Sequence, residues 1–156
     1  MYCTRTLALV ILAVLASGPI AAQEAAPDAL AVETEQFNRE RRQLVQQNLE
    51  LTKSEAEGFW PIYDQFERDR AVLTKTRRAL IDEFGEHYDV MTDAMAKKLL
   101  HGYINFEEEH VRLWKIYFGK FDKVLPIKKL ARYYQIEHKI RAFVDAGIAQ
   151  ELPLLK

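Results

Sequence analysis

The chain has 156 residues, of which 49% are hydrophobic and 29% are charged, so a single globular domain with its own core is expected. A formal net charge of −1 gives no reason to expect binding of nucleic acid through overall charge. Five prolines and six glycines are few for this length, which favours long helices over a sheet of many strands.

The first 22 residues have the parts of an export signal. Arg5 supplies a positive charge, residues 7–16 are an uninterrupted apolar run, and the small Ala22 precedes Gln23 at a suitable cleavage point. The apolar run is about half of the roughly 20 residues that a membrane-spanning helix needs, so cleavage is favoured over an anchor. Cleavage would also remove Cys3, the single cysteine. We therefore expect an extracytoplasmic protein, and a bacterial periplasm fits best.

The rest of the chain divides into a leader and a helical domain. Residues 23–32 are small and weakly patterned, so we expect a flexible leader there, followed by a domain at residues 33–156. The first helix of this domain is expected at residues 33–49. Its thin apolar stripe consists of Phe37, Leu44, Val45 and Leu49, and its charged side carries Arg39, Glu40, Arg41 and Arg42.

A second helix begins at a motif that starts with Leu51. Thr52 followed by Glu55 is a capping box, in which each side chain bonds the backbone N–H of the other residue. The pattern recurs at Met91 and Thr92, where a third helix should begin, and we assign these five residues a structural role. One face of the second helix, apolar except for two arginines, consists of Ala56, Phe59, Tyr63, Phe66, Arg70, Leu73, Arg77, Leu80 and Phe84.

The connections between helices predict how they pack. A short break at residues 85–90 should let the second and third helices pack antiparallel as a hairpin, each arm about 45 Å long. Pro126 should open a fourth helix that runs to about residue 150, because proline is tolerated in a first helical turn. The expected fold is all-α: an elongated four-helix protomer built on a long antiparallel hairpin. Its many aromatic side chains exceed what one protomer readily buries, so we expect a homodimer.

Two sets of side chains are candidates for binding a partner. The aromatic set is either helix core or an exposed patch that grips other proteins, and it consists of Phe59, Trp60, Tyr63 and Phe66. The basic set lies in residues 111–141, which hold nine basic and two acidic residues. This stretch is either a solvated face or a surface that attracts acidic unfolded proteins or anionic lipid heads. The basic candidates are Lys123, Lys128, Lys129 and Arg132.

The sequence contains no recognised catalytic or cofactor-binding motif. It has no glycine-rich phosphate loop, no Cys–His pair and no Gly-x-Ser-x-Gly elbow, so we expect a protein that is not an enzyme and uses no cofactor. Glu107 and His110 have the spacing of a di-iron ligand pair. Such sites need a second pair, and none is found around His87, His101 or His138. We therefore assign no metal site.

The capping motifs resemble a known family. Thr52 with Glu55, and its echo at Thr92, are similar to the paired LTxxQ motifs of the Spy/CpxP superfamily of exported, all-helical bacterial proteins. Residues 59–63 and 125–129 resemble a less characterised, sensor-like branch of that superfamily. Glu55 stands where the motif has glutamine, and the second copy has methionine at both the leucine and the glutamine positions. The resemblance implies a four-helix protomer whose hairpins pair into a curved homodimer.

The functions implied by this resemblance are binding functions. Some members are ATP-independent chaperones that hold unfolded proteins, so we expect a holdase or an adaptor of the envelope-stress type. The alternative is a periplasmic metal-sensing protein, or one that regulates a sigma-factor system or a sensor kinase by contact. The expected partners are unfolded or envelope proteins and a second copy of the chain. A membrane sensor is a further candidate, and export argues against nucleic acid.

Overall fold

The computed structural model describes residues 29–155, with side chains from residue 36 onward, and this part of the chain is helical without any strand. The elements are α1 (Ala29–Leu49), α2 (Lys53–His87), the short 3-10 helix η1 (Tyr88–Val90), α3 (Asp93–Phe121) and α4 (Ile127–Glu151). The predicted all-α class with four long helices is confirmed.

The N-terminal predictions are only partly covered by the described residues. The export signal at residues 1–22 lies outside them, as do residues 23–28 of the expected leader. α1 begins at Ala29 rather than at residue 33, so the last four positions of the expected leader are helical.

Local capping bonds lie at the starts of α2 and α3, as the sequence predicts. Thr52 Oγ1 accepts a hydrogen bond from the Glu55 N–H at 3.3 Å, and Glu55 Oε2 accepts one from the Thr52 N–H at 2.7 Å. At α3, Thr92 Oγ1 accepts from the Met95 N–H at 3.3 Å, but Met95 has no side-chain oxygen to return the bond. Pro126 precedes α4 in the N-cap position.

The capping box gives a first prediction. Thr52→Ala should lower the free energy of unfolding by about 1 kcal/mol, because the Glu55 N–H loses its side-chain acceptor. As a matched control, Ser54→Ala in the exposed first turn of the same helix should change it by less than about 0.5 kcal/mol. Urea unfolding followed by circular dichroism measures both variants. Equal effects of the two substitutions would contradict the capping role.

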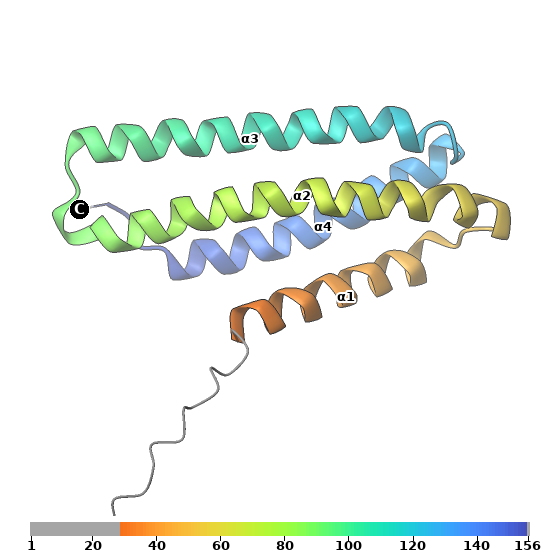
Figure 1. Cartoon of the computed structure of the whole chain (residues 1–156), viewed down its shortest axis with the longest axis horizontal. Coiled ribbons are helices and arrows are strands. Elements are labelled where there is room, and N and C mark those ends of the chain that lie inside the picture. Colours follow the sequence, from red (N-terminus) through yellow and green to blue (C-terminus); the bar gives the residue numbers. More distant parts are fainter. Residues whose placement is uncertain (1–28, 156) are drawn as a thin grey trace, which may run out of the picture.

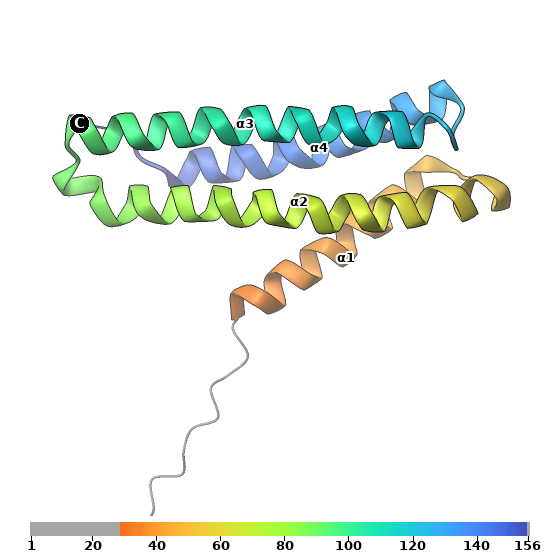
Figure 2. The ribbon, with the colours of Figure 1, turned by 45° about the horizontal axis from the view of Figure 1, so that its top comes forward.

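The four helices associate as two pairs. α2 and α3 pack antiparallel, which confirms the predicted hairpin, and α1 packs against α4 (Figures 1 and 2). α1 extends along only part of the bundle, so near the turn between α2 and α3 the described helices are α2, α3 and α4 (Figure 1). The C-terminal segment ends at this turn, where the Tyr88 hydroxyl donates to the Leu154 carbonyl at 3.0 Å.

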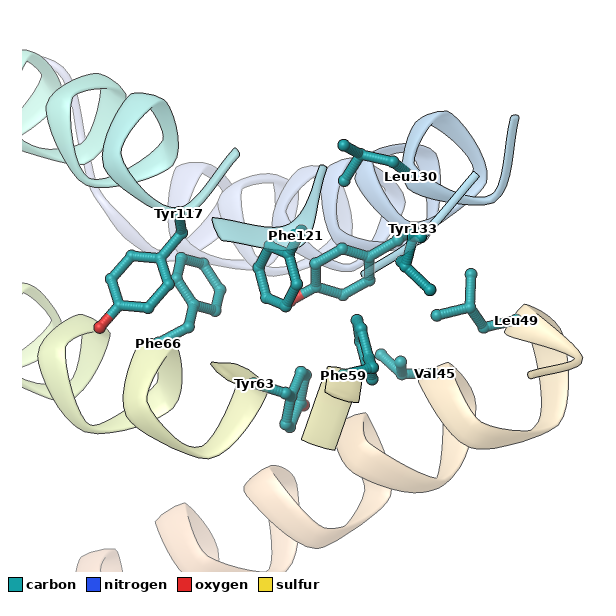
Figure 3. Packing of buried hydrophobic residues seen from close by; sticks show 10 residues of the cluster. Val45, Leu49, Phe59, Tyr63, Phe66, Tyr117, Phe121, Leu130 and Tyr133 are labelled. Carbon is teal, nitrogen blue, oxygen red and sulfur yellow. The ribbon is translucent and has the colours of Figure 1, made fainter. Parts of the chain in front are cut away.

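The hydrophobic core lies between the two pairs, at the end of the bundle where α1 leads into α2 (Figure 3). Phe121 and Tyr133 meet near its centre with ring centroids 4.9 Å apart, and most neighbouring rings are tilted or edge to face. Such pairs are favoured by the charge distribution of aromatic rings, in addition to the burial of their area. Six buried rings form the centre of the core: Phe59, Tyr63, Phe66, Tyr117, Phe121 and Tyr133.

Burial decides between the two interpretations of the aromatic candidates. Phe59, Tyr63 and Phe66 are at most 1% exposed, so they are core residues and an exposed patch at these positions is wrong for this protomer. The three-four spacing could not separate the two cases, because a buried stripe and an exposed one have the same helical period. Trp60 is half-buried, and the guanidinium carbon of Arg42 lies 4.3 Å from the centroid of its ring.

The inward face of α1 also differs from the expected stripe. Val45 and Leu49 are buried as predicted, but Leu44 is exposed. Arg41, which lies one helical turn before Val45, is buried on the inward face of the helix instead. A charged residue therefore completes the inward face of this helix.

Candidate functional site

A line of charged side chains follows the aromatic core along α4. On α4, Glu137, Arg141 and Asp145 follow Tyr133 at intervals of four residues, so the four side chains share one face of the helix. Each of the three charged residues reaches a different neighbouring helix. The inward face of α4 therefore changes from aromatic to charged residues, and the charged residues after Glu137 are partly exposed.

Glu137 and Arg41 form a buried ion pair between α4 and α1. Glu137 is 2% exposed and Arg41 is 6% exposed. Arg41 Nε donates to Glu137 Oε2 at 2.9 Å, and the Nη2 group of Arg41 bonds the same oxygen. Glu67 of α2 lies 4.0 Å from Arg41 Nε. The second oxygen of Glu137, Oε1, has no hydrogen-bond partner among the described residues. A buried oxygen without a donor raises the free energy of the folded state.

Arg141 connects α4 to α3. Its Nη2 group donates to both carboxylate oxygens of Glu107, at 2.7 and 2.5 Å, and its Nη1 group lies 2.6 Å from His110 Nδ1. Burial, followed by the charge of Arg141, lowers the pKa of His110 to about 4. A guanidinium group only donates, so the bond requires a neutral His110 ring with its proton on Nε2.

These contacts describe the pair that the sequence singled out as possible metal ligands. Glu107 and His110 do lie on one face of α3, but both are bound by the cationic Arg141. Among the residues with described side chains, no group of three or more His, Cys, Asp or Glu residues could hold a metal ion.

The arginines on the inward face of α2 also form ion pairs with carboxylates of this region. Arg77 donates to Asp145 at 2.6 Å, and Arg70 Nε donates to Glu67 at 3.1 Å. The ion pairs form two groups, which we together call the charged network: Arg41 and Arg70 with Glu67 and Glu137, and Arg77 and Arg141 with Glu107 and Asp145. The formal charges of the network therefore cancel.

Hollows border this network, and we name two of them by their place. The central hollow, of about 380 Å³, is lined by all four helices, and its exposed lining residues come from α3 and α4. The end hollow, of about 540 Å³, lies between α2, α3 and α4 near the turn between α2 and α3. The end hollow is largely apolar, with side chains such as Leu80, Phe84, Leu99, Leu100, Ile148 and Leu152.

Four exposed apolar residues on one side of α3 are spread between the two hollows. Leu100, Ile104, Val111 and Phe118 are between 45% and 60% exposed. At 100° per residue these four positions lie within about 40° of one another around the helix, so we call them the α3 stripe. Leu100 lines the end hollow, and Val111 and Phe118 line the central hollow.

The basic candidates lie in or just after the turn between α3 and α4. Lys123 and Lys128 are exposed, and neither forms an ion pair with another described residue. Lys129 instead donates to Glu55 Oε2 at 2.6 Å and to the Glu50 carbonyl at 2.9 Å. It ties the start of α4 to the capping box of α2, so its role here is structural. Arg132 is exposed and lies 3.4 Å from a carboxylate oxygen of Glu50.

Sequence reasoning missed the charged network, including its buried members Arg41 and Glu137. The sequence pattern predicts that Arg41 lies on the charged side of α1, and it presents Glu137 only as one acidic residue in a basic stretch. The spacing of Glu137, Arg141 and Asp145 does signal a shared helix face. Nothing in that spacing distinguishes an exposed row of charges from a buried one.

Comparisons of the chain with protein-family models, with curated proteins and with solved structures found no match. The resemblance to the Spy/CpxP superfamily therefore rests on the motif residues themselves. Among the described residues, no helix combines the length and the apolar character needed to cross a membrane.

Proposed function

We propose that the protein is an exported, non-enzymatic binding protein that holds unfolded segments of other proteins, as an ATP-independent chaperone or an envelope-stress adaptor. The observation that carries the proposal is the α3 stripe, an aligned set of exposed apolar side chains that ends in the end hollow. Aligned exposed apolar side chains are the kind of surface from which interaction sites on proteins are built. Export is supported by the composition of residues 1–22.

Charge suggests which segments would bind. The exposed Lys123 and Lys128 lie beyond the C-terminal end of α3, while the end hollow lies near its N-terminal end. α3 has 29 residues and is about 43 Å long. An extended chain needs about 13 residues to cover that length at 3.3 Å per residue. The proposed ligand is an extended segment of that length, apolar along α3 and acidic at the end near the two lysines.

The other functions implied by the resemblance have less support. Metal sensing through Glu107 and His110 would require both side chains to leave Arg141. Regulation of a membrane sensor by contact would use the same exposed surface, but it would be selective for one partner. The homodimer remains part of the proposal, and sedimentation velocity at tens of micromolar measures it.

Aggregation of an unrelated unfolding protein tests the proposed function. The purified protein should suppress this aggregation without ATP, measured by light scattering. The double variant Leu100→Gln and Ile104→Gln should need roughly tenfold more protein for the same suppression, because it loses apolar contacts with the unfolded chain. Val72→Gln is a matched control, since Val72 is 64% exposed but lies on α2 outside the stripe.

The role of the two exposed lysines is tested by measuring how the rate of capture of unfolded protein depends on salt concentration. Lys123→Gln with Lys128→Gln should slow capture at low salt and flatten its salt dependence, because exposed charges are screened over about 8 Å at physiological salt. Circular dichroism checks that the helices are retained. Full suppression by the Leu100 and Ile104 variant, or none by the wild-type protein, would contradict the proposal.

A further inference from the structure

The end hollow is lined by apolar side chains that the described chain leaves partly uncovered. Its volume of about 540 Å³ falls within the roughly 300–1,000 Å³ of typical ligand pockets. All of its lining residues keep accessible surface, and the most exposed of those on α3 are Leu100 and Tyr103, at 60% and 44%. A ligand in this hollow can therefore reach its walls.

The walls of the end hollow carry no net charge. Their two charged residues, Arg77 and Asp145, bond each other at 2.6 Å. The remaining lining residues are alanine, methionine and large aliphatic or aromatic residues. An uncharged and mainly apolar ligand fits such walls, because a charged one would lose its hydration without gaining a partner.

One segment of the chain itself already lies at this hollow. α4 ends at Glu151, and Pro153 explains that end, because proline has no backbone N–H and disfavours the helical conformation of the residue before it. Leu152 is accordingly extended, with φ −88° and ψ 118°. Residues 152–155, which we call the strap, continue from α4 toward the turn between α2 and α3 (Figure 1).

The strap makes the contacts expected of a bound peptide. Leu152 and Leu155 line the end hollow, whereas Leu154 between them is 90% exposed and does not line it. The Tyr88 hydroxyl donates to the Leu154 carbonyl at 3.0 Å. Extended peptides are recognised in this way, through alternate side chains in pockets and hydrogen bonds to the backbone. The strap therefore indicates which chemistry the end hollow accepts.

The strap is held weakly enough to leave the hollow. Leu155 is half exposed, the bond from Tyr88 lies at the surface, and Pro153 has no N–H to donate. Segments with few buried contacts open at a low cost in free energy. Because the strap is covalently joined to α4, it competes with any free segment at an effective concentration on the order of millimolar.

We propose that the end hollow binds extended, uncharged peptide segments with two leucines three positions apart, and that the strap occupies this site until such a segment displaces it. The proposal rests on the proposed function, because unfolded proteins are the source of such segments. It adds the sequence that the apolar end of a bound segment carries. It also adds a contact within the chain that limits access to the hollow.

Two adjacent leucines of the strap test this competition. Leu155→Gln should make the purified protein bind a dye-labelled peptide, Gly-Leu-Pro-Leu-Leu-Gly, about three- to fivefold more tightly, because the strap loses an apolar contact. Leu154→Gln is the matched control and should change the affinity less than about twofold, since this side chain does not line the hollow. Fluorescence anisotropy measures the affinity. A peptide whose first and last leucines are glutamine should bind roughly tenfold more weakly.

Removing the strap tests the same competition by a second route. A chain that stops after Glu151 should bind the peptide roughly tenfold more tightly, because the competing segment is lost. Circular dichroism checks that its helices are retained. In this shortened chain, Ala96→Leu should weaken binding about fivefold by filling part of the hollow. Ala94→Leu should leave binding unchanged, because Ala94 is exposed on the same helix and does not line the hollow.

Peptide binding requires no unfolded protein, so it separates this proposal from the proposed function. Equal affinities of the full and shortened chains, equal effects of the two leucine substitutions, or no binding by the shortened chain at millimolar concentration would overturn the proposal. Each of these results would do so even where aggregation is suppressed. Failure to suppress aggregation, with the peptide results as expected, would contradict the chaperone function and support the peptide site.

Discussion

Replacing Glu137 with alanine should lower the free energy of unfolding by about 3–5 kcal/mol. The substitution leaves the Arg41 guanidinium buried without the carboxylate that bonds it at 2.9 Å. Glu67 compensates little, because it is 4.0 Å away and already bonds Arg70. Urea unfolding at neutral pH, followed by circular dichroism, measures the loss.

Two further variants show whether the loss comes from an uncompensated charge. Glu108→Ala removes an exposed glutamate from α3 and should change the free energy of unfolding by less than about 0.5 kcal/mol. The double variant Arg41→Met with Glu137→Leu removes both charges and should be more stable than Glu137→Ala, because no charge is then left buried without a partner. A double variant less stable than the single one would contradict this explanation.

Phe121→Ala should lower the free energy of unfolding by a similar amount, about 3–5 kcal/mol, because packing around the ring is lost. The ring of Phe121 is completely buried and contacts four other rings, with centroid distances of 5.2 Å to Phe59 and 4.9 Å to Tyr133 among them. Truncation leaves a cavity where α2, α3 and α4 meet. Thermal unfolding and urea unfolding both report the change.

Phe143→Ala is the control for this packing effect. Phe143 is 79% exposed on α4, so the same chemical truncation should change the free energy of unfolding by about 0.5 kcal/mol or less. Comparable losses in the two variants would show that Phe121 does not hold the position described. A large loss for Phe143 alone would instead indicate a contact made in an assembly of several chains.

The helix starts could be predicted because capping acts within a few residues. Thr52 and Glu55 need only each other's backbone N–H, and the observed bonds are those expected from the motif. The hairpin was predictable for a related reason, since a short connection between two long helices leaves few alternatives to antiparallel packing.

The candidate site was less predictable, because its residues meet across the chain. Arg41 and Glu137 are 96 positions apart, and neither belongs to a motif. The charge of its neighbours predicts that Lys129 belongs to a binding surface, but in the structure it bonds Glu55 of the capping box. Local composition shows whether a stretch is positive or negative, but it does not show which residue each charged side chain pairs with.

The sequence by itself determined that the described chain is helical, where α2, α3 and α4 begin and that α2 and α3 form a hairpin. Each of these properties follows from interactions within one helix or across one short turn. Only the tertiary structure decided which side of each periodic stripe is buried. It put Phe59, Tyr63 and Phe66 in the core, left the α3 stripe exposed and placed Arg41 beside Glu137. These outcomes depend on how α1 and α4 pack against the hairpin, and helical period alone carries no information about that packing.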